Sequence, residues 1–179
     1  TGGVVQETVQ FEDAACLFSG GLDSLTGAID LLDDGQKLIL VGHHDSPLTD
    51  NRQVVLFNEI RSVYGADRVS QRRLYLRPAK WSTRQEMPLP DGEFERTTRA
   101  RSFLFIAAGL VVADSIGPDG TLFVPENGYI GVNVPLTGSR SGSLSTRTTH
   151  PFFFSKMKQL LEAVGLGGHA IENPFRLKT

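Results

Sequence analysis

Short apolar runs alternate along the chain with longer segments whose apolar residues recur at helical spacing. The runs predict five strands, at residues 14–18, 37–41, 73–76, 121–124 and 169–172. Strands that alternate with helices form parallel sheets covered by helices on both faces, because each parallel connection needs a crossover. We therefore predict an α/β, Rossmann-like doubly wound fold, with a mainly parallel sheet and helices on both of its faces.

Helical periodicity predicts helices at residues 25–32, 51–64, 98–115 and 155–164. Asp50 is expected to cap the second of these helices and Gly65 to end it. The third is apolar nearly all round, which predicts a central position. Residues 77–97 and 138–149 lack a periodic pattern. We expect long loops there, the first a lid, a binding loop or a mobile segment, and the second a surface loop.

Composition narrows the class of protein. The 179 residues suffice for about one domain, and we expect residues 1–179 to form a single domain cut from a longer chain. A net charge of −2 and a pI near 6.1 give no basic field that would recruit nucleic acid. Cys16, the only cysteine, lies in the first apolar run and is predicted to be a core residue. The absence of a disulfide framework and of a membrane-length apolar run favours a soluble cytoplasmic protein.

The most informative polar segment, Ser-Gly-Gly-Leu-Asp-Ser, runs from Ser19 to Ser24 directly after the first apolar run. A strand, two glycines and a helix start expose main-chain N–H groups that can surround a phosphate chain. Gly20 and Gly21 let the backbone approach phosphate oxygens, and the serines add hydroxyl donors. Asp23 suits a helix N-terminus and can reach a magnesium ion held by the phosphates. The alternative is an ordinary turn capped by Asp23 or Ser24.

Polar residues also follow two further predicted strands, and open parallel sheets bind ligands at the carboxyl ends of their strands. Gly-His-His-Asp occupies residues 42–45, and Glu-Asn-Gly occupies residues 126–128. We expect His43 to line the same site, with a metal site or a plain loop as alternatives. Neighbouring strand residues point to opposite faces, which argues against two converging imidazoles. The amide of Asn127 suits recognition of a base-like ring, although Asn-Gly is also a common turn.

Two arginines, Arg99 and Arg101, stand at the start of the longest predicted helix. Cations there are disfavoured by roughly 0.3–1 kcal/mol each at exposed sites, and a bound polyphosphate reverses the sign of that effect. We interpret them as anion-binding residues, with arginines that face solvent as the alternative. Arg140 and Arg147, in the loop before the last helix, are further candidates to close over phosphates or a carboxylate.

The segment Ser-Gly-Gly-Leu-Asp-Ser after a first strand resembles the signature of the PP-loop ATP pyrophosphatases. Residues 101–102, 130–133 and 173–179 resemble segments of the QueC-like family, the 7-cyano-7-deazaguanine synthases. Residues 126–128 and 145–151 are similar to the QatC-type branch of that family, which occurs in bacterial anti-phage systems. The resemblance covers most of the chain beyond the first strand.

This resemblance implies an adenine nucleotide alpha hydrolase-like domain that binds ATP and Mg²⁺, adenylates a 7-carboxy-7-deazaguanine-like carboxylate and releases pyrophosphate. The activated acid would pass to ammonia or to a protein amine, in anti-phage defence. It implies catalytic roles for Asp23, Ser24 and Arg101, with Asp23 also near Mg²⁺. The implied cofactor-binding residues are Ser19, Gly20, Gly21, Leu22, Asp23, Ser24, His43, Arg101 and Lys178. The implied substrate-binding residues are Glu126, Asn127, Gly128 and Arg147. Zinc stays open, because the family's cysteines lie beyond the matched segment.

Two other functions remain open. One is a PP-loop enzyme that modifies tRNA, which would need a basic surface or sulfur-carrying cysteines, and neither occurs in these residues. The other is an adenine-nucleotide-binding module without catalytic activity. Release of pyrophosphate distinguishes an enzyme from such a module.

Overall fold

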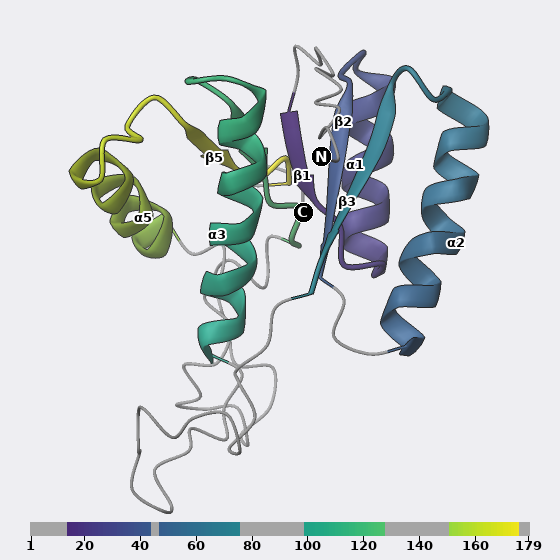
Figure 1. The fold of residues 1–179 in the computed structure, drawn as a ribbon, viewed down its shortest axis with the longest axis horizontal. Coiled ribbons are helices and arrows are strands. Elements are labelled where there is room, and N and C mark those ends of the chain that lie inside the picture. Colours follow the sequence, from purple (N-terminus) through teal and green to yellow (C-terminus); the bar gives the residue numbers. More distant parts are fainter. Residues whose placement is uncertain (1–13, 44–46, 76–98, 128–150, 176–179) are drawn as a thin grey trace, which may run out of the picture.

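The computed structural model describes residues 14–43, 47–75, 99–127 and 151–175 (Figure 1). Its sheet has five strands in the order β3-β2-β1-β4-β5, and every neighbouring pair is parallel. The strands are β1 (Ala14–Leu17), β2 (Leu38–His43), β3 (Val69–Leu74), β4 (Thr121–Phe123) and β5 (Ala170–Glu172). The helices are α1 (Leu22–Asp33), α2 (Pro47–Tyr64), α3 (Arg99–Ile116) and α5 (Pro151–Ala163). The predicted Rossmann-like doubly wound α/β fold is confirmed.

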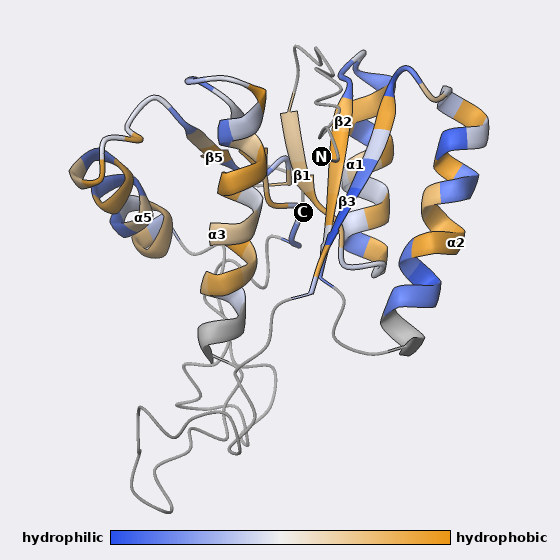
Figure 2. Cartoon of the chain, viewed as in Figure 1, coloured by the Kyte–Doolittle hydropathy of each residue, from blue (hydrophilic) through white to orange (hydrophobic). Residues whose placement is uncertain are grey.

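Each face of the sheet has its own hydrophobic core, because successive side chains of a strand point to opposite faces. Cys16 and its neighbours two residues away, Ala14 and Phe18, pack with α1 and α2. Ala15 and Leu17 point to the other face and pack with α3 and α5. The two pairs of helices lie on opposite sides of the sheet, and the inner strands β1 and β2 are apolar, whereas the edge strand β3 is mostly hydrophilic (Figures 1 and 2). The buried position predicted for Cys16 is confirmed.

The strand order reverses at β1. The chain winds outward from β1 through β2 to β3, and then crosses to β4 and β5 on the other side of β1. The carboxyl ends of β1 and β4 therefore diverge into loops that lead to opposite faces of the sheet, which is where ligands bind in open α/β sheets. The topology thus marks one place at the sheet edge as the expected site.

Several elements differ from their sequence predictions. α1 begins at Leu22 and α5 at Pro151, three and four residues before their predicted starts. β3 begins at Val69, four residues before the predicted start, and ends at Leu74. This edge strand carries exposed arginines and only Val69 is fully buried, so it lacks the apolar signal of an inner strand. α2 begins at Pro47, which places Asp50 in its first turn and not at its cap. α3 packs on β1, β2 and β4 as a central helix would, but its outer side is open, with Val111 71% exposed.

The predicted long loops, residues 77–97 and 138–149, lie outside the described residues. Within the part of the chain that the structure describes, no helix combines the length and the apolarity that a membrane span requires. Gly65 ends α2 as expected, with a φ of +94° and its N–H bonded to the carbonyl of Arg61.

Candidate nucleotide-binding site

The segment between β1 and α1, here called the glycine loop (residues 19–21), turns the chain from the sheet into the helix. Gly20 has a φ of +80°, a conformation that residues with side chains rarely adopt. Gly21 is the N-cap of α1, with extended backbone angles and no side-chain cap hydrogen bond. The predicted alternative, a turn capped by Asp23 or Ser24, is therefore not what the structure contains. Because Gly21 has no side chain, the N-cap offers no side-chain acceptor to the main-chain N–H groups of the first turn.

Two serine hydroxyls close a small ring of hydrogen bonds within the loop. Ser24 Oγ donates to the carbonyl of Gly21 at 2.9 Å and lies 3.2 Å from Ser19 Oγ. The N–H of Gly21 donates to Ser19 Oγ at 3.3 Å. Because the Ser24 proton is already used, Ser19 is the donor between the two hydroxyls. Ser24 is buried, and its hydroxyl fixes the shape of the loop.

A cavity of about 260 Å³ opens in front of this loop, at the carboxyl ends of β1 and β4. It is lined by Leu17, Ser19, Gly21, Leu22, Asp23, Ser24, Ser102, Phe105, Val124, Pro125 and Glu126. The structure thus brings the glycine loop, the first turn of α1 and Glu126 together around one space. Ser102 adds the start of α3, so two helix N-termini border the same cavity. Both termini carry partial positive charge, which favours an anionic ligand.

Leu22, the first residue of α1, is 74% exposed and forms part of the cavity wall. An apolar side chain held this open beside polar groups provides a contact surface for the uncharged part of a ligand. Asp23 follows it and is partly exposed, so its carboxylate is accessible from the cavity. No group of three or more His, Cys, Asp or Glu side chains suited to a metal occurs in the described parts of the chain.

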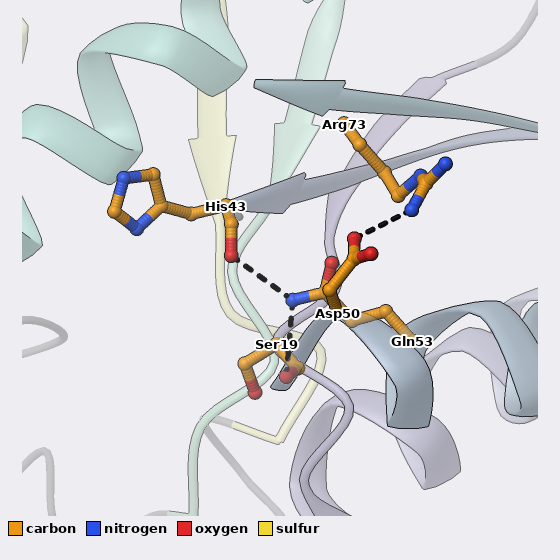
Figure 3. A network of polar contacts seen from close by, with 5 residues as sticks. All are labelled: Ser19, His43, Asp50, Gln53 and Arg73. Carbon is orange, nitrogen blue, oxygen red and sulfur yellow. Dashed lines mark hydrogen bonds and ion pairs between the residues drawn. The ribbon is translucent and has the colours of Figure 1, made fainter. Parts of the chain in front are cut away.

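His43 ends β2 and lies beside the cavity without lining it. Its ring is tilted by 48° against that of Phe105, with 6.3 Å between the ring centroids, and Phe105 is a lining residue. Figure 3 shows the imidazole pointing away from Gln53, whose amide bonds the His43 carbonyl. His44 and Asp45 lie outside the described residues, so the metal alternative for this segment is not addressed by the structure.

The segment after β4 forms the opposite wall of the cavity. Asn173, which follows β5 and is buried, donates through Nδ2 to the carbonyl of Glu126 at 2.8 Å. A Cβ at Gly27 would lie 2.4 Å from Pro125 Cβ, so α1 and this wall are in close contact.

Some predicted site residues lie outside the described part of the chain, namely Gly128, Arg147, Lys178 and the side chain of Arg101. The backbone of Arg101 lies in the first turn of α3, next to Ser102.

Gln53 is a residue of the site that sequence reasoning missed. Its Nε2 donates to the carbonyls of Ser19 at 3.3 Å and His43 at 3.2 Å (Figure 3). The available signal was its spacing, since Gln53 precedes Phe57 and Ile60 on the buried side of α2 by four and seven residues. A polar residue on an apolar helix face needs a hydrogen-bond partner in the interior.

Burial raises the pKa of the Cys16 thiol to about 12, so this thiol stays protonated near neutral pH and is no nucleophile.

Comparison with models of known protein families and with curated proteins found no match to this chain.

Proposed function

We propose that this protein is a QueC-like PP-loop enzyme that uses ATP and Mg²⁺ to adenylate a carboxylate and release pyrophosphate. One observation carries the proposal. The hydroxyls of Ser19 and Ser24 form hydrogen bonds within the glycine loop. The first turn of α1 has no side chain at its N-cap and borders a cavity at the point where strand order reverses. Donors arranged in this way suit a phosphate chain.

The residues around the cavity also fit a magnesium–triphosphate group. Gly21 lines the cavity without a side chain, so phosphate oxygens could approach its backbone, and the positive φ of Gly20 sets the turn before it. Asp23 supplies a hard oxygen ligand from the first turn of α1. When bound there, Mg²⁺ would neutralise charge that develops on the phosphates. Arg101, at the start of α3, would add a second cationic group by the family resemblance.

The reaction needs alignment and charge stabilisation, and no nucleophilic side chain. A carboxylate oxygen of the substrate attacks the α-phosphorus of ATP, the bond to the bridging oxygen breaks, and pyrophosphate leaves with its electron pair. An amine then attacks the acyl carbon of the adenylate, loses a proton, and AMP departs. Glu126, Asn127, Gly128 and Arg147 are the proposed substrate-binding residues.

From the family resemblance we further propose a 7-carboxy-7-deazaguanine-like acid, with ammonia or a protein amine as acceptor, in a cytoplasmic anti-phage system. His43 and Lys178 complete the proposed nucleotide site. The test is mass spectrometry of full-length protein incubated with ATP, candidate deazapurine acids and the products of neighbouring genes. Detection of pyrophosphate with an acyl adenylate or its amide supports the proposal. Binding of ATP without pyrophosphate under all of these conditions would indicate a non-catalytic module.

Two variants test the site itself. We expect Asp23→Asn to slow pyrophosphate release by about 100-fold and Arg101→Ala by about 10-fold or more, with circular dichroism spectra unchanged. Asp34→Asn is the matched control for the first variant, because Asp34 is exposed at the other end of α1. Arg61→Ala, on the exposed side of α2, is the control for the second. Pyrophosphate release at the wild-type rate in both site variants would rule out this assignment.

A further inference from the structure

Gln53 lies in α2, outside the segments that carry the resemblance, and its side chain reaches the sheet edge beside the glycine loop. It is 1% exposed, and its Nε2 donates to the carbonyls of Ser19 and His43. An amide nitrogen carries two protons, so both are used. Ser19 follows β1 and His43 ends β2, and the N–H of Phe18 still pairs with the carbonyl of Val41 just before them. The amide therefore continues the pairing of two strands at the point where their backbones separate.

Two glycines make room for this amide. A Cβ at Gly42 would lie 2.2 Å from Gln53 Oε1, and a Cβ at Gly20 would lie 3.2 Å from Gln53 Cγ. The first of these distances does not occur between non-bonded atoms, so a side chain at Gly42 would displace the amide. Both glycines flank the carbonyls that Gln53 binds, which shows that the backbone is built around this side chain.

The orientation of the amide is fixed by its partners. Oε1 is buried without a hydrogen-bond partner in the described residues, while Nε2 faces two acceptors. A flipped amide would place Oε1 against both carbonyls, which is worse. A buried acceptor without a partner lowers stability, and an apolar side chain of similar size would avoid this cost but would leave two carbonyls without their donor. The two hydrogen bonds that Nε2 donates are therefore what the amide contributes, and they fix the positions of these carbonyls.

An exposed ion pair lies near Gln53 in α2. Asp50, three residues earlier in α2, forms an ion pair with Arg73 of the edge strand β3 (Figure 3). Both side chains are partly exposed, so this pair adds little to stability. The pair involves neither of the carbonyls that Gln53 binds, so its removal supplies a control that leaves the contacts of Gln53 unchanged.

We infer that Gln53 is a positioning residue, which holds the carbonyls of Ser19 and His43 and so keeps the glycine loop in the shape with which it borders the cavity. The expected effect on ligand binding rests on the proposed function, because a loop that loses this contact would then bind phosphate less well. The loop geometry itself can be tested without any nucleotide. The two readouts therefore separate a failure of this inference from a failure of the proposed function.

The first experiment is hydrogen exchange on full-length wild-type protein, Gln53→Met and Asp50→Asn, without nucleotide. Met matches the volume of Gln without its donors. We expect exchange at residues 19–22 to be at least about 10-fold faster in Gln53→Met, with exchange in the middle of α1 and in the Asp50→Asn control near wild type. Equal exchange at residues 19–22 in all three proteins would overturn the inference, whatever the protein binds.

The second experiment uses Gln53→Glu, which keeps the shape of the side chain and makes the donor dependent on pH. An ionised carboxylate cannot donate to the two carbonyls, whereas a protonated carboxyl donates one hydrogen bond. We expect ATP–Mg²⁺ affinity in this variant to be about 10-fold below wild type near pH 8 and to recover towards pH 5.5, because a Glu facing acceptors titrates above its usual range. The titratable or charged neighbours are His43, Asp50, Arg52 and Arg73. Their effect on affinity is measured in wild-type protein over the same pH range.

The outcomes are distinct. A pH-dependent loss of affinity in Gln53→Glu but not in wild type supports the inference, and a constant ratio between them across pH contradicts it. If Gln53→Met does not fold, Gln53→Glu also serves for the exchange measurement, with slower exchange at residues 19–22 expected at the lower pH after correction for intrinsic rates. If wild-type protein binds no ATP, the proposed function fails, and the exchange data alone decide the role of Gln53.

Discussion

The glycine-loop side of the cavity and the β4–β5 side each rely on one buried side-chain amide, and they use it in different ways. Gln53 reaches from α2 to the carbonyls of Ser19 and His43, which are 34 and 10 residues away in the sequence. Its Oε1 has no partner among the described residues. This amide therefore connects segments that are distant in the sequence, and its oxygen accepts no hydrogen bond from the described residues.

Asn173 forms a closed unit on the other side. Its Nδ2 donates to the carbonyl of Glu126 at 2.8 Å, and its Oδ1 accepts the N–H of Phe175 at 2.9 Å. Both the oxygen and the nitrogen of the amide have a hydrogen-bond partner. The contact of the oxygen forms an Asx turn, and that of the nitrogen connects this turn to the segment after β4. The Asn173 side therefore forms a wall whose amide is satisfied locally, whereas the Gln53 side connects α2 to two strand ends and supports the glycine loop.

The largest expected effect comes from Gly27→Ala, which would force the two sides apart. The added Cβ would lie 2.4 Å from Cβ and 2.8 Å from Cγ of Pro125, whose ring cannot rotate away. We expect the free energy of unfolding to fall by about 2–3 kcal/mol in urea titrations, in spite of the better helix propensity of Ala. Gly117→Ala is the control, since nothing lies within 4 Å of its Cβ, and it should be nearly neutral. Equal stability of Gly27→Ala and wild type would show that α1 and the wall are not in tight contact.

A smaller effect is expected for Asn173→Asp, which breaks only the contact to Glu126. The carboxylate keeps an acceptor for the N–H of Phe175 and loses the donor, so the carbonyl of Glu126 loses the hydrogen bond from Asn173. We expect a loss of about 1–2 kcal/mol in the free energy of unfolding near neutral pH. Burial beside that carbonyl raises the pKa of the new carboxyl in the folded state, so the lost stability should return as the pH falls.

Asn173→Asp also tests whether the two sides of the cavity are independent of each other. Because the glycine loop has its own support, hydrogen exchange at residues 19–22 should stay at the wild-type rate in Asn173→Asp. Faster exchange there, similar to that expected for Gln53→Met, would mean that the two sides of the cavity are coupled.

The sequence was a good guide where burial determines the pattern. β1 and β2 lie between two layers of helices, so both faces are apolar and the runs mark them within two residues of their observed ends. β3 was misplaced by four residues because it lies at the edge of the sheet, where Arg72 and Arg73 can point to solvent. In the site, the glycine loop could be located from sequence, because adjacent glycines between a strand and a helix indicate exposed main-chain donors.

Gln53 and the role of Asn173 were missed for a common reason. Both side chains bond main-chain carbonyls, and a carbonyl exists at every residue, so no particular sequence partner reveals the contact. Only the three-dimensional position of the strand ends determines which carbonyls are within reach. A polar residue on the buried face of a helix is the sequence signal that remains, and it indicates a partner without identifying it.

The smallest expected effect is that of Gly42→Ala. It tests whether a side chain on the glycine-loop side can move to make room for a methyl group, as the ring of Pro125 cannot. The Cβ would lie 2.2 Å from Oε1, the far end of a flexible side chain, so the amide can swing away at the cost of its hydrogen bonds. We expect a loss of about 1 kcal/mol in the free energy of unfolding, partly offset by the lower backbone entropy cost of Ala relative to Gly. In a Gln53→Ala background the obstacle is absent, so the same substitution should be neutral or slightly stabilising. Urea titration of both single variants and the double variant measures this coupling, and effects that add within about 0.5 kcal/mol would show that Gly42 and Gln53 are independent.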